Sequence, residues 1–230
     1  MADLHWTMPI ARWTSISTAE VPGVEALDPM VRRRMSRLSR LALQAAFDCA
    51  REKAALRVVF ASRHGELTRT TTILDSIQAA EPVSPTAFSL SVLNAATGIF
   101  GIARRDRSAA TAIAAGRETL GFALLEAFSQ YQTSPETPVL LVYAHEPADS
   151  VYAAVDDDPD SIGFAVLVDS DGAAGHLACE MAAIGPLDQD AAEAAGTQSA
   201  AVLRCLSTRG TTVWRGDDSQ WRWSWHERAA

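Results

Sequence analysis

Short apolar segments alternate with longer helical ones along the first two-thirds of the chain, and this alternation constrains the fold most. Residues 57–62, 109–114 and 138–143 are short apolar runs, as expected for buried strands. The segments between them have the pattern of helices, in which apolar residues recur at spacings of three and four. We therefore predict an α/β domain.

The predicted helices differ in how they are buried. Residues 28–53 are expected to form one long helix, capped by Asp28 and with Pro29 at its first position. Its core-facing stripe consists of Val31, Met35, Leu38, Ala42, Ala45 and Cys49. Residues 88–103 are apolar on nearly every side, which is typical of a buried helix. Further helices are predicted at residues 66–80, 118–131 and 191–206.

The last third of the chain is predicted to be mostly strand. Two strands, at 163–168 and near 176–184, are joined by a turn, and a helix separates them from a Trp-rich end. There, three tryptophans alternate with polar residues, which is the period of a strand. With one more on a preceding strand, the set is Trp214, Trp221, Trp223 and Trp225. These side chains either cover an apolar face within the chain or form an interface.

Composition excludes several classes of protein. The chain has 230 residues, 48% hydrophobic and 21% charged, so it resembles a soluble globular protein that can bury a core. No linker divides it, and residues 1–230 are predicted to be one domain with a Trp-rich C-terminal β extension. A net charge of −8 argues against nucleic-acid binding. With no run of eighteen apolar residues and no visible signal peptide, neither a membrane span nor secretion is expected.

Motifs of known chemistry are mostly missing. The cysteines, Cys49, Cys179 and Cys205, are widely spaced, which indicates free thiols in a reducing cytoplasm. Neither a metal nor a cofactor is expected, because ligand spacings and phosphate-binding loops are absent. The acidic residues 156–160 are interpreted as a solvated loop. The first predicted helix carries a cluster of five arginines: Arg32, Arg33, Arg34, Arg37 and Arg40. The cluster is either a solvated helix face or a docking site for an acidic partner.

Several motifs, in this order and spacing, resemble the N-terminal half of β-ketoacyl synthases. They are Ser84-Pro85, the Ser-x-x-Asn-Ala-Ala-x-Gly stretch at 91–98 that contains Asn94, then Arg107 and residues 111–116. Residues 59–66 and 141–143 resemble more narrowly the short ketosynthase-like chain-length factors of aryl-polyene pigment clusters. The resemblance covers about residues 29–184.

The resemblance implies a thiolase-like fold, in which two βαβαβαββ halves form a five-layered body. This chain has the length of one half and a short tail. We therefore expect a thiolase-like half-fold, with a mixed sheet and a buried helix layer. A half-fold should leave apolar faces uncovered, and such faces usually mark interfaces.

The resemblance also implies that no catalytic residue is present. Active ketosynthases carry a nucleophilic Cys at the start of the buried helix, where the helix N-terminus lowers its pKa. Counting from Asn94 without gaps places that position at Arg117, whereas aligning on the Thr-Ala dipeptide places it at Ile113. Neither side chain can form a thioester. The family's two catalytic histidines come from the second half, and His176 and His226 match neither of them.

The function implied is that of a non-catalytic subunit of chain-length-factor type, which pairs with a full-length β-ketoacyl synthase as a heterodimer or larger assembly. Pairing is expected through the strand at 109–114, and Phe88 is expected to help set the depth of the partner's acyl pocket. The expected interface and pocket residues are Ala87, Phe88, Asn94, Ala109, Thr111, Ile113 and Arg117. The acyl carrier protein is expected to engage mainly the ketosynthase, with Arg33 and Arg37 as docking residues.

Two alternatives stay open on sequence grounds. The chain is an acyl hydrolase or acyltransferase if Ser62 and His64, or His145 as base, meet in a pocket. It is a purely stabilising module if it binds a ketosynthase without affecting product length.

Overall fold

The computed structural model describes residues 3–17, 21–51, 53–149, 151–152, 158, 160–183 and 196–227. Within these residues eight strands form one mixed sheet in the order β3-β2-β4-β5-β1-β6-β8-β7. The strands are β1 (Leu4–Ile16), β2 (Arg57–Ala61), β3 (Ala110–Ile113), β4 (Val139–His145), β5 (Ile162–Val168), β6 (Gly175–Ala183), β7 (Thr211–Arg215) and β8 (Ser219–Glu227). The helices are α1 (Pro29–Arg34), α2 (Arg37–Ala50), α3 (Leu67–Gln78), α4 (Pro85–Ser89), α5 (Ala95–Arg104), α6 (Thr119–Thr133) and α7 (Gln198–Thr208).

The order of elements from β1 to β5 is the βαβαβαββ order expected of half a thiolase-like fold. Strand β2 pairs in parallel with β3 on one side and with β4 on the other. The pairs β4–β5, β5–β1 and β1–β6 are antiparallel. None of the described helices is both long enough and apolar enough to cross a membrane.

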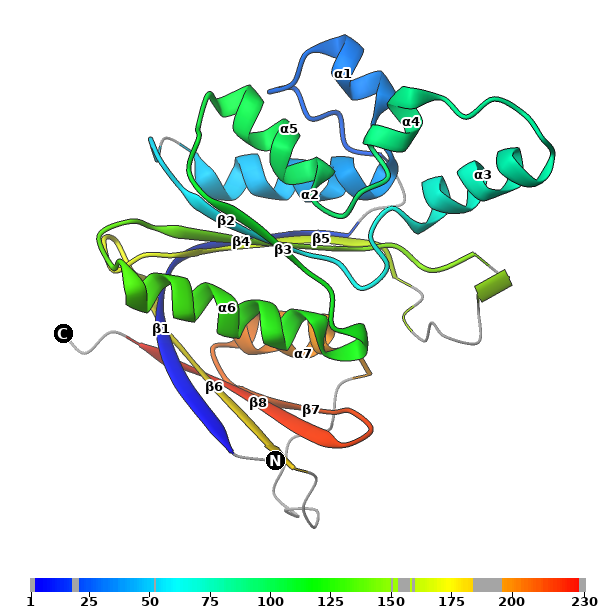
Figure 1. Cartoon of the computed structure of the whole chain (residues 1–230). Helices are drawn as coiled ribbons and strands as arrows, with labels where there is room; N and C mark the ends of the chain where they lie inside the picture. The colour runs from blue at the N-terminus through cyan, green and yellow to red at the C-terminus, as the bar shows by residue number, and fades with distance from the viewer. Residues whose placement is uncertain are drawn as a thin grey trace.

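The sheet curls, and this gives the molecule its layers (Figure 1). Helices α1 to α5 lie on the outer side of the strands β3, β2, β4 and β5. Helices α6 and α7 lie on the other side, between those strands and the returning part of the sheet, β6, β8 and β7. The long strand β1 joins the two parts, so a single sheet encloses one helix layer.

Two hydrophobic cores follow from this arrangement. The outer core packs α2 and part of α5 on the strands, with Leu38, Ala45 and Phe100 among its buried side chains. The inner core surrounds α6, whose Leu120, Leu124 and neighbours are buried between the two parts of the sheet. A helix enclosed on both sides is the buried layer that the resemblance implied.

The C-terminal tryptophans cover α6 and α7 within the chain. Trp214, Trp221 and Trp223 are almost fully buried in the inner core, and Trp225 is partly buried beside it. The ring of Trp221 meets Trp6 and Phe122 edge-on, with centroid distances of 6.1 and 5.2 Å. Of the two alternatives for these residues, intramolecular covering is therefore the observed one.

The predictions for two helices were wrong: the first in its extent and the second in its burial. Residues 28–53 form two helices, because Met35 is extended and the Ser36 hydroxyl caps α2 by accepting from the backbone N–H of Ser39. The apolar segment 88–103 is not a buried helix. It divides between α4 and α5, and its exposed side chains include Phe88 (63%), Val92 (46%) and Ile102 (80%).

Replacing Trp221 by alanine should lower the free energy of unfolding by about 3–5 kcal/mol, because it empties the centre of the inner core. Urea unfolding followed by far-UV circular dichroism measures the change. Trp225→Ala is the matched control, and its loss should be clearly smaller because that ring is only partly buried. Equal losses from the two variants would contradict the central role given to Trp221.

Candidate functional site

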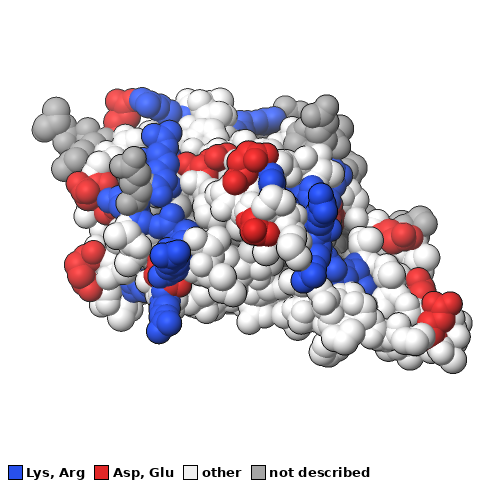
Figure 2. Space-filling model, turned by 90° about the horizontal axis from the view of Figure 1, so that it is seen from above, with Lys and Arg blue, Asp and Glu red and all other residues white. Residues whose placement is uncertain are grey.

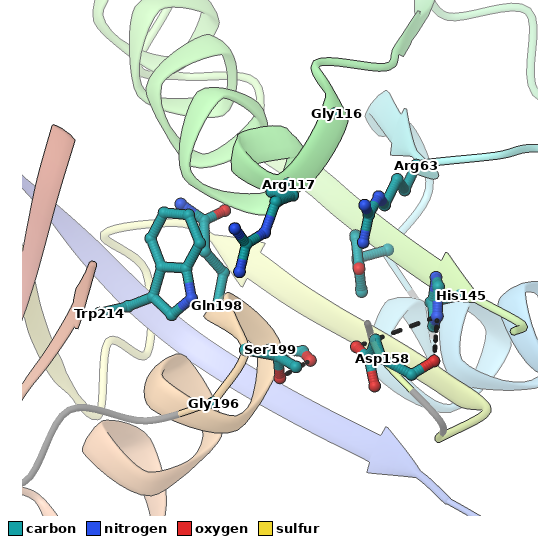
Figure 3. A pocket seen from close by; sticks show the side chains of 11 residues that line it. Arg63, Gly116, Arg117, His145, Asp158, Gly196, Gln198, Ser199 and Trp214 are labelled. Atoms are coloured by element: carbon teal, nitrogen blue, oxygen red, sulfur yellow. Dashed lines mark hydrogen bonds and ion pairs between the residues drawn. The ribbon is translucent and has the colours of Figure 1, made fainter. Parts of the chain in front are cut away.

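A cavity lies where β2 and β4 end and where α6 and α7 begin (Figure 3). Arg63 and His145 border it from the strand ends, Arg117 from the start of α6, and Ser199 from the start of α7. Trp214 reaches it from the C-terminal hairpin. The ends of parallel strands are a common place for ligands in α/β folds, so this is the first place to look for chemistry.

Arg117 and Ile113 are the two positions that the sequence offered for the family's nucleophile, and Arg117 is the one that lines the cavity. It lies in the 3-10 turn Gly116–Glu118 that leads directly into α6, whereas Ile113 is the last residue of β3. Its guanidinium lies 5.9 Å from the ring centroid of Trp214 and forms a 3.0 Å ion pair with Asp217. The C-terminal hairpin thus contacts the side chain of Arg117, which cannot form a thioester.

The start of α6 is fixed by further contacts from the same hairpin. Glu118 accepts hydrogen bonds from the Ser219 hydroxyl at 2.7 Å and from the Trp221 indole N–H at 3.2 Å. On the other side, the backbone N–H of Gly121 donates to Oε1 of Gln198 at 2.9 Å. Two separate elements, β8 and α7, therefore anchor the first turn of the buried helix.

His145 is almost fully buried, and its ring is engaged within the chain. Its Nε2 donates to the backbone carbonyl of Asp158 at 3.1 Å, and the Asp158 carboxylate lies 4.0 Å away. The Asp158 side chain is itself buried, so the prediction of a solvated loop was wrong at this residue. Most of the remaining acidic loop lies outside the described residues, and Asp160 is exposed. The contact between His145 and Asp158 was not predicted, because no sequence pattern shows that Asp158 folds back onto the end of β4.

Ser62 is not placed to act as a nucleophile in the cavity. It is buried and does not line the cavity. Its hydroxyl accepts from the backbone N–H of Gly65 at 3.0 Å, which closes the turn after β2. The predicted pair of Ser62 and His64 thus has no support as a hydrolytic centre.

The cysteines lie elsewhere. Cys49 is in α2, Cys179 in β6 and Cys205 in α7, and all three are free and buried. Burial raises the pKa of Cys49 and of Cys205 to about 12 and also raises the pKa of Cys179. These thiols are therefore protonated near neutral pH and do not supply the nucleophile. Among the described residues, no cluster of three or more His, Cys, Asp or Glu side chains is placed to hold a metal ion.

The other predicted site residues lie apart from this cavity. None of Ala87, Phe88, Asn94, Ala109 or Thr111 lines it. Ala87 and Phe88 are on α4, Asn94 precedes α5, Ala109 precedes β3, and Thr111 lies within β3, where its hydroxyl accepts from Gln130. The structure therefore does not bring the predicted residues together with Arg117 in one site.

The segments that carry those residues form a surface without charge, which we call the uncharged face: residues 82–103 and 108–116. Neither range contains an Asp, Glu, Lys or Arg. Strand β3 is the edge of the sheet, and α5 lies beside it (Figure 1). An edge strand with unpaired backbone groups and an exposed apolar helix beside it is typical of a surface that another protein covers.

The arginine cluster on α1 and α2 is largely engaged within the chain. Arg32 pairs with Glu25 at 3.0 Å, and Arg37 donates to the Ser161 hydroxyl at 3.1 Å. Arg33 is exposed. Figure 2 shows acidic side chains interspersed among the basic ones on this side of the molecule, rather than one continuous basic surface.

Comparisons with solved structures agree with the observed fold. A structure described as a ketosynthase (ApeO) in complex with its chain length factor (ApeC), from Xenorhabdus doucetiae, matches with 26% identity and a TM-score of 0.78. That match covers 95% of this chain and 99% of that chain. The ishigamide ketosynthase/chain length factor matches at 18% identity and a TM-score of 0.55, over 88% of this chain and 72% of that chain.

A third solved structure extends the likeness of fold to a longer enzyme. It is the ketosynthase from module 1 of the bacillaene synthase of Bacillus amyloliquefaciens FZB42, with 12% identity and a TM-score of 0.50. The match covers 75% of this chain but 36% of that one. None of the curated proteins compared matches the chain.

The family comparison covers nearly the whole chain. Residues 6–224 match the family described as Beta-ketoacyl synthase, N-terminal domain. This range runs from the first strand to the last and includes the Trp-rich hairpin. The chain therefore belongs to the family of β-ketoacyl synthase N-terminal domains.

Proposed function

We propose that this chain is a chain length factor: a non-catalytic subunit that pairs with an active β-ketoacyl synthase and shapes its acyl pocket. The pair would act in polyketide-type biosynthesis of the aryl-polyene kind, in the cytoplasm. Under this proposal the partner supplies the nucleophilic cysteine and both histidines, and this chain supplies one wall of the pocket.

The uncharged face is the observation that carries this proposal. An α/β protein normally directs charged side chains to solvent, yet residues 82–103 have none and expose Phe88, Val92 and Ile102. On the other side of the sheet, the tryptophans already cover the helix layer. A chain whose inner side is closed by its own tryptophans and whose outer side carries an uncharged face is suited to one large partner.

Two further observations support the proposal. The aligned parts of this chain and of the matched Xenorhabdus chain are 95% and 99%, so the two chains have nearly the same length. That structure is described as a ketosynthase with its chain length factor. In this chain an arginine held by Trp214 and Asp217 stands at the start of α6, which supports a role without covalent catalysis.

Pairing is tested by co-expression with the ketosynthase encoded beside this chain, followed by size-exclusion chromatography with mass detection. We expect a stable complex, and Val92→Asp should weaken it about tenfold or more because a carboxylate would be buried without a partner. Met30→Asp is the matched control, since Met30 is also exposed but lies on α1 beside the arginines. A wild-type chain that stays monomeric with this ketosynthase would overturn the proposal.

Phe88→Ala tests the influence on product length. Phe88 is mostly exposed on α4, so the substitution should leave the chain folded. If its ring closes the end of the partner's acyl pocket, then removing it deepens the pocket and the products should lengthen. Mass spectrometry of the products measures this. An intact complex with unchanged products would favour a module that only stabilises the ketosynthase.

We also propose that the acyl carrier protein docks at Arg33. Arg37 is committed to Ser161 and lies 3.9 Å from Glu146, whereas Arg33 is exposed. Arg33→Glu should lower the affinity of the complex for its acidic carrier by about three- to tenfold. Arg204→Glu, an exposed site on α7, is the control. Equal carrier affinity in both variants, measured by fluorescence anisotropy, would rule out docking at Arg33.

A further inference from the structure

Helix α3 projects from the body of the molecule (Figure 1). None of its twelve residues is buried, although the helix has four apolar residues, Leu67, Ile73, Leu74 and Ile77. Leu74 and Ile77 expose 53% and 58% of their surface. In most surface helices such residues would face the protein's own core.

The orientation of α3 is the reverse of the usual one. A groove separates it from the start of α2 and from α4, and the side chains of α3 that line the groove are Thr68, Arg69, Thr72 and Ile73. Leu74 follows Thr72 by two residues, which places it on the opposite side of a helix. The groove side of α3 is therefore mostly polar, although it includes Ile73, while Leu74 and Ile77 are exposed to solvent.

The composition of α3 does not suit a helix that stays in water. It has two charged residues, and one of them, Arg69, is bound to Glu66 at 3.3 Å and to the carbonyl of Arg34 at 3.0 Å. Thr70, Thr71 and Thr72 donate to the carbonyls four residues earlier, which satisfies their hydroxyls but adds little helix stability. Neither its own sequence nor the core of this chain stabilises α3 strongly.

We infer that α3 is a docking arm for the ketosynthase partner, whose apolar contact surface consists of Leu74 and Ile77. This inference rests on the proposed function. The partner is the occupant because α3 packs against α4, which belongs to the uncharged face and carries Phe88. The outward side of α3 therefore continues the surface that the ketosynthase is proposed to cover.

The test compares two variants that each add negative charge to α3. Leu74→Asp combined with Ile77→Asp places carboxylates on the outward side and should raise the Kd for the ketosynthase at least about thirtyfold. Thr72→Asp, on the groove side, should change the Kd less than about threefold. Biolayer interferometry with the immobilised ketosynthase measures the Kd. Because all three side chains are exposed, thermal unfolding of each free variant should match the wild type.

The outcomes separate this inference from the proposed function. If the wild-type chain binds the ketosynthase and the double variant binds equally well, then the docking arm is refuted while the proposed function stands. If the double variant loses only self-association, seen by analytical ultracentrifugation, then a second copy of this chain is the occupant and the inference is likewise refuted. If the wild-type chain does not bind, then the proposed function itself fails.

Discussion

The packing of Trp221 on Gly121 is the contact on which the rest of the structure depends. A β-carbon at position 121 would lie 2.7 Å from the indole ring, so glycine alone lets the ring rest on the buried helix. The same indole donates to Glu118, which ties the hairpin to the first turn of α6. One side chain thus closes the inner core and fixes the first turn of the buried helix. The curled sheet therefore covers the helix layer of α6 and α7, which a second half of the fold would otherwise cover.

This closure has a direct consequence for the other side of the molecule. Since β6, β8 and β7 already cover α6 and α7, the surface left without charge lies on α4, on α5 up to Ala103 and on the edge strand β3. The apolar side of α3 continues it. At the start of α6, Arg117 pairs with Asp217 of the C-terminal hairpin. The chain is consequently organised as one wall of an assembly, with its own stability supplied from the opposite side.

Much of the fold was predictable because its inner strands are uniformly apolar, as in residues 138–143. Strand β1 was not predicted although apolar residues alternate from Leu4 to Ile10, and its position is set by pairing with β5 and β6. The break at Met35 depends on a distant group, Glu66, which accepts from the Ser36 hydroxyl. Residues 88–103 were predicted to be buried because a sequence pattern does not distinguish the core of its own chain from that of a partner. The burial of Asp158 could not be predicted, because no sequence pattern shows that this residue folds back onto the end of β4.

Hydrogen exchange of this chain, alone and in complex with its ketosynthase, tests the central claim most directly. The account predicts slower amide exchange on pairing in β3, α4, α5 and α3, and no change in β7 and β8, because the Trp-rich hairpin is already covered within the chain. Protection confined to β7 and β8, with free exchange in β3 and α4, would contradict the account, since the partner would then be seated on the side that the tryptophans were found to close.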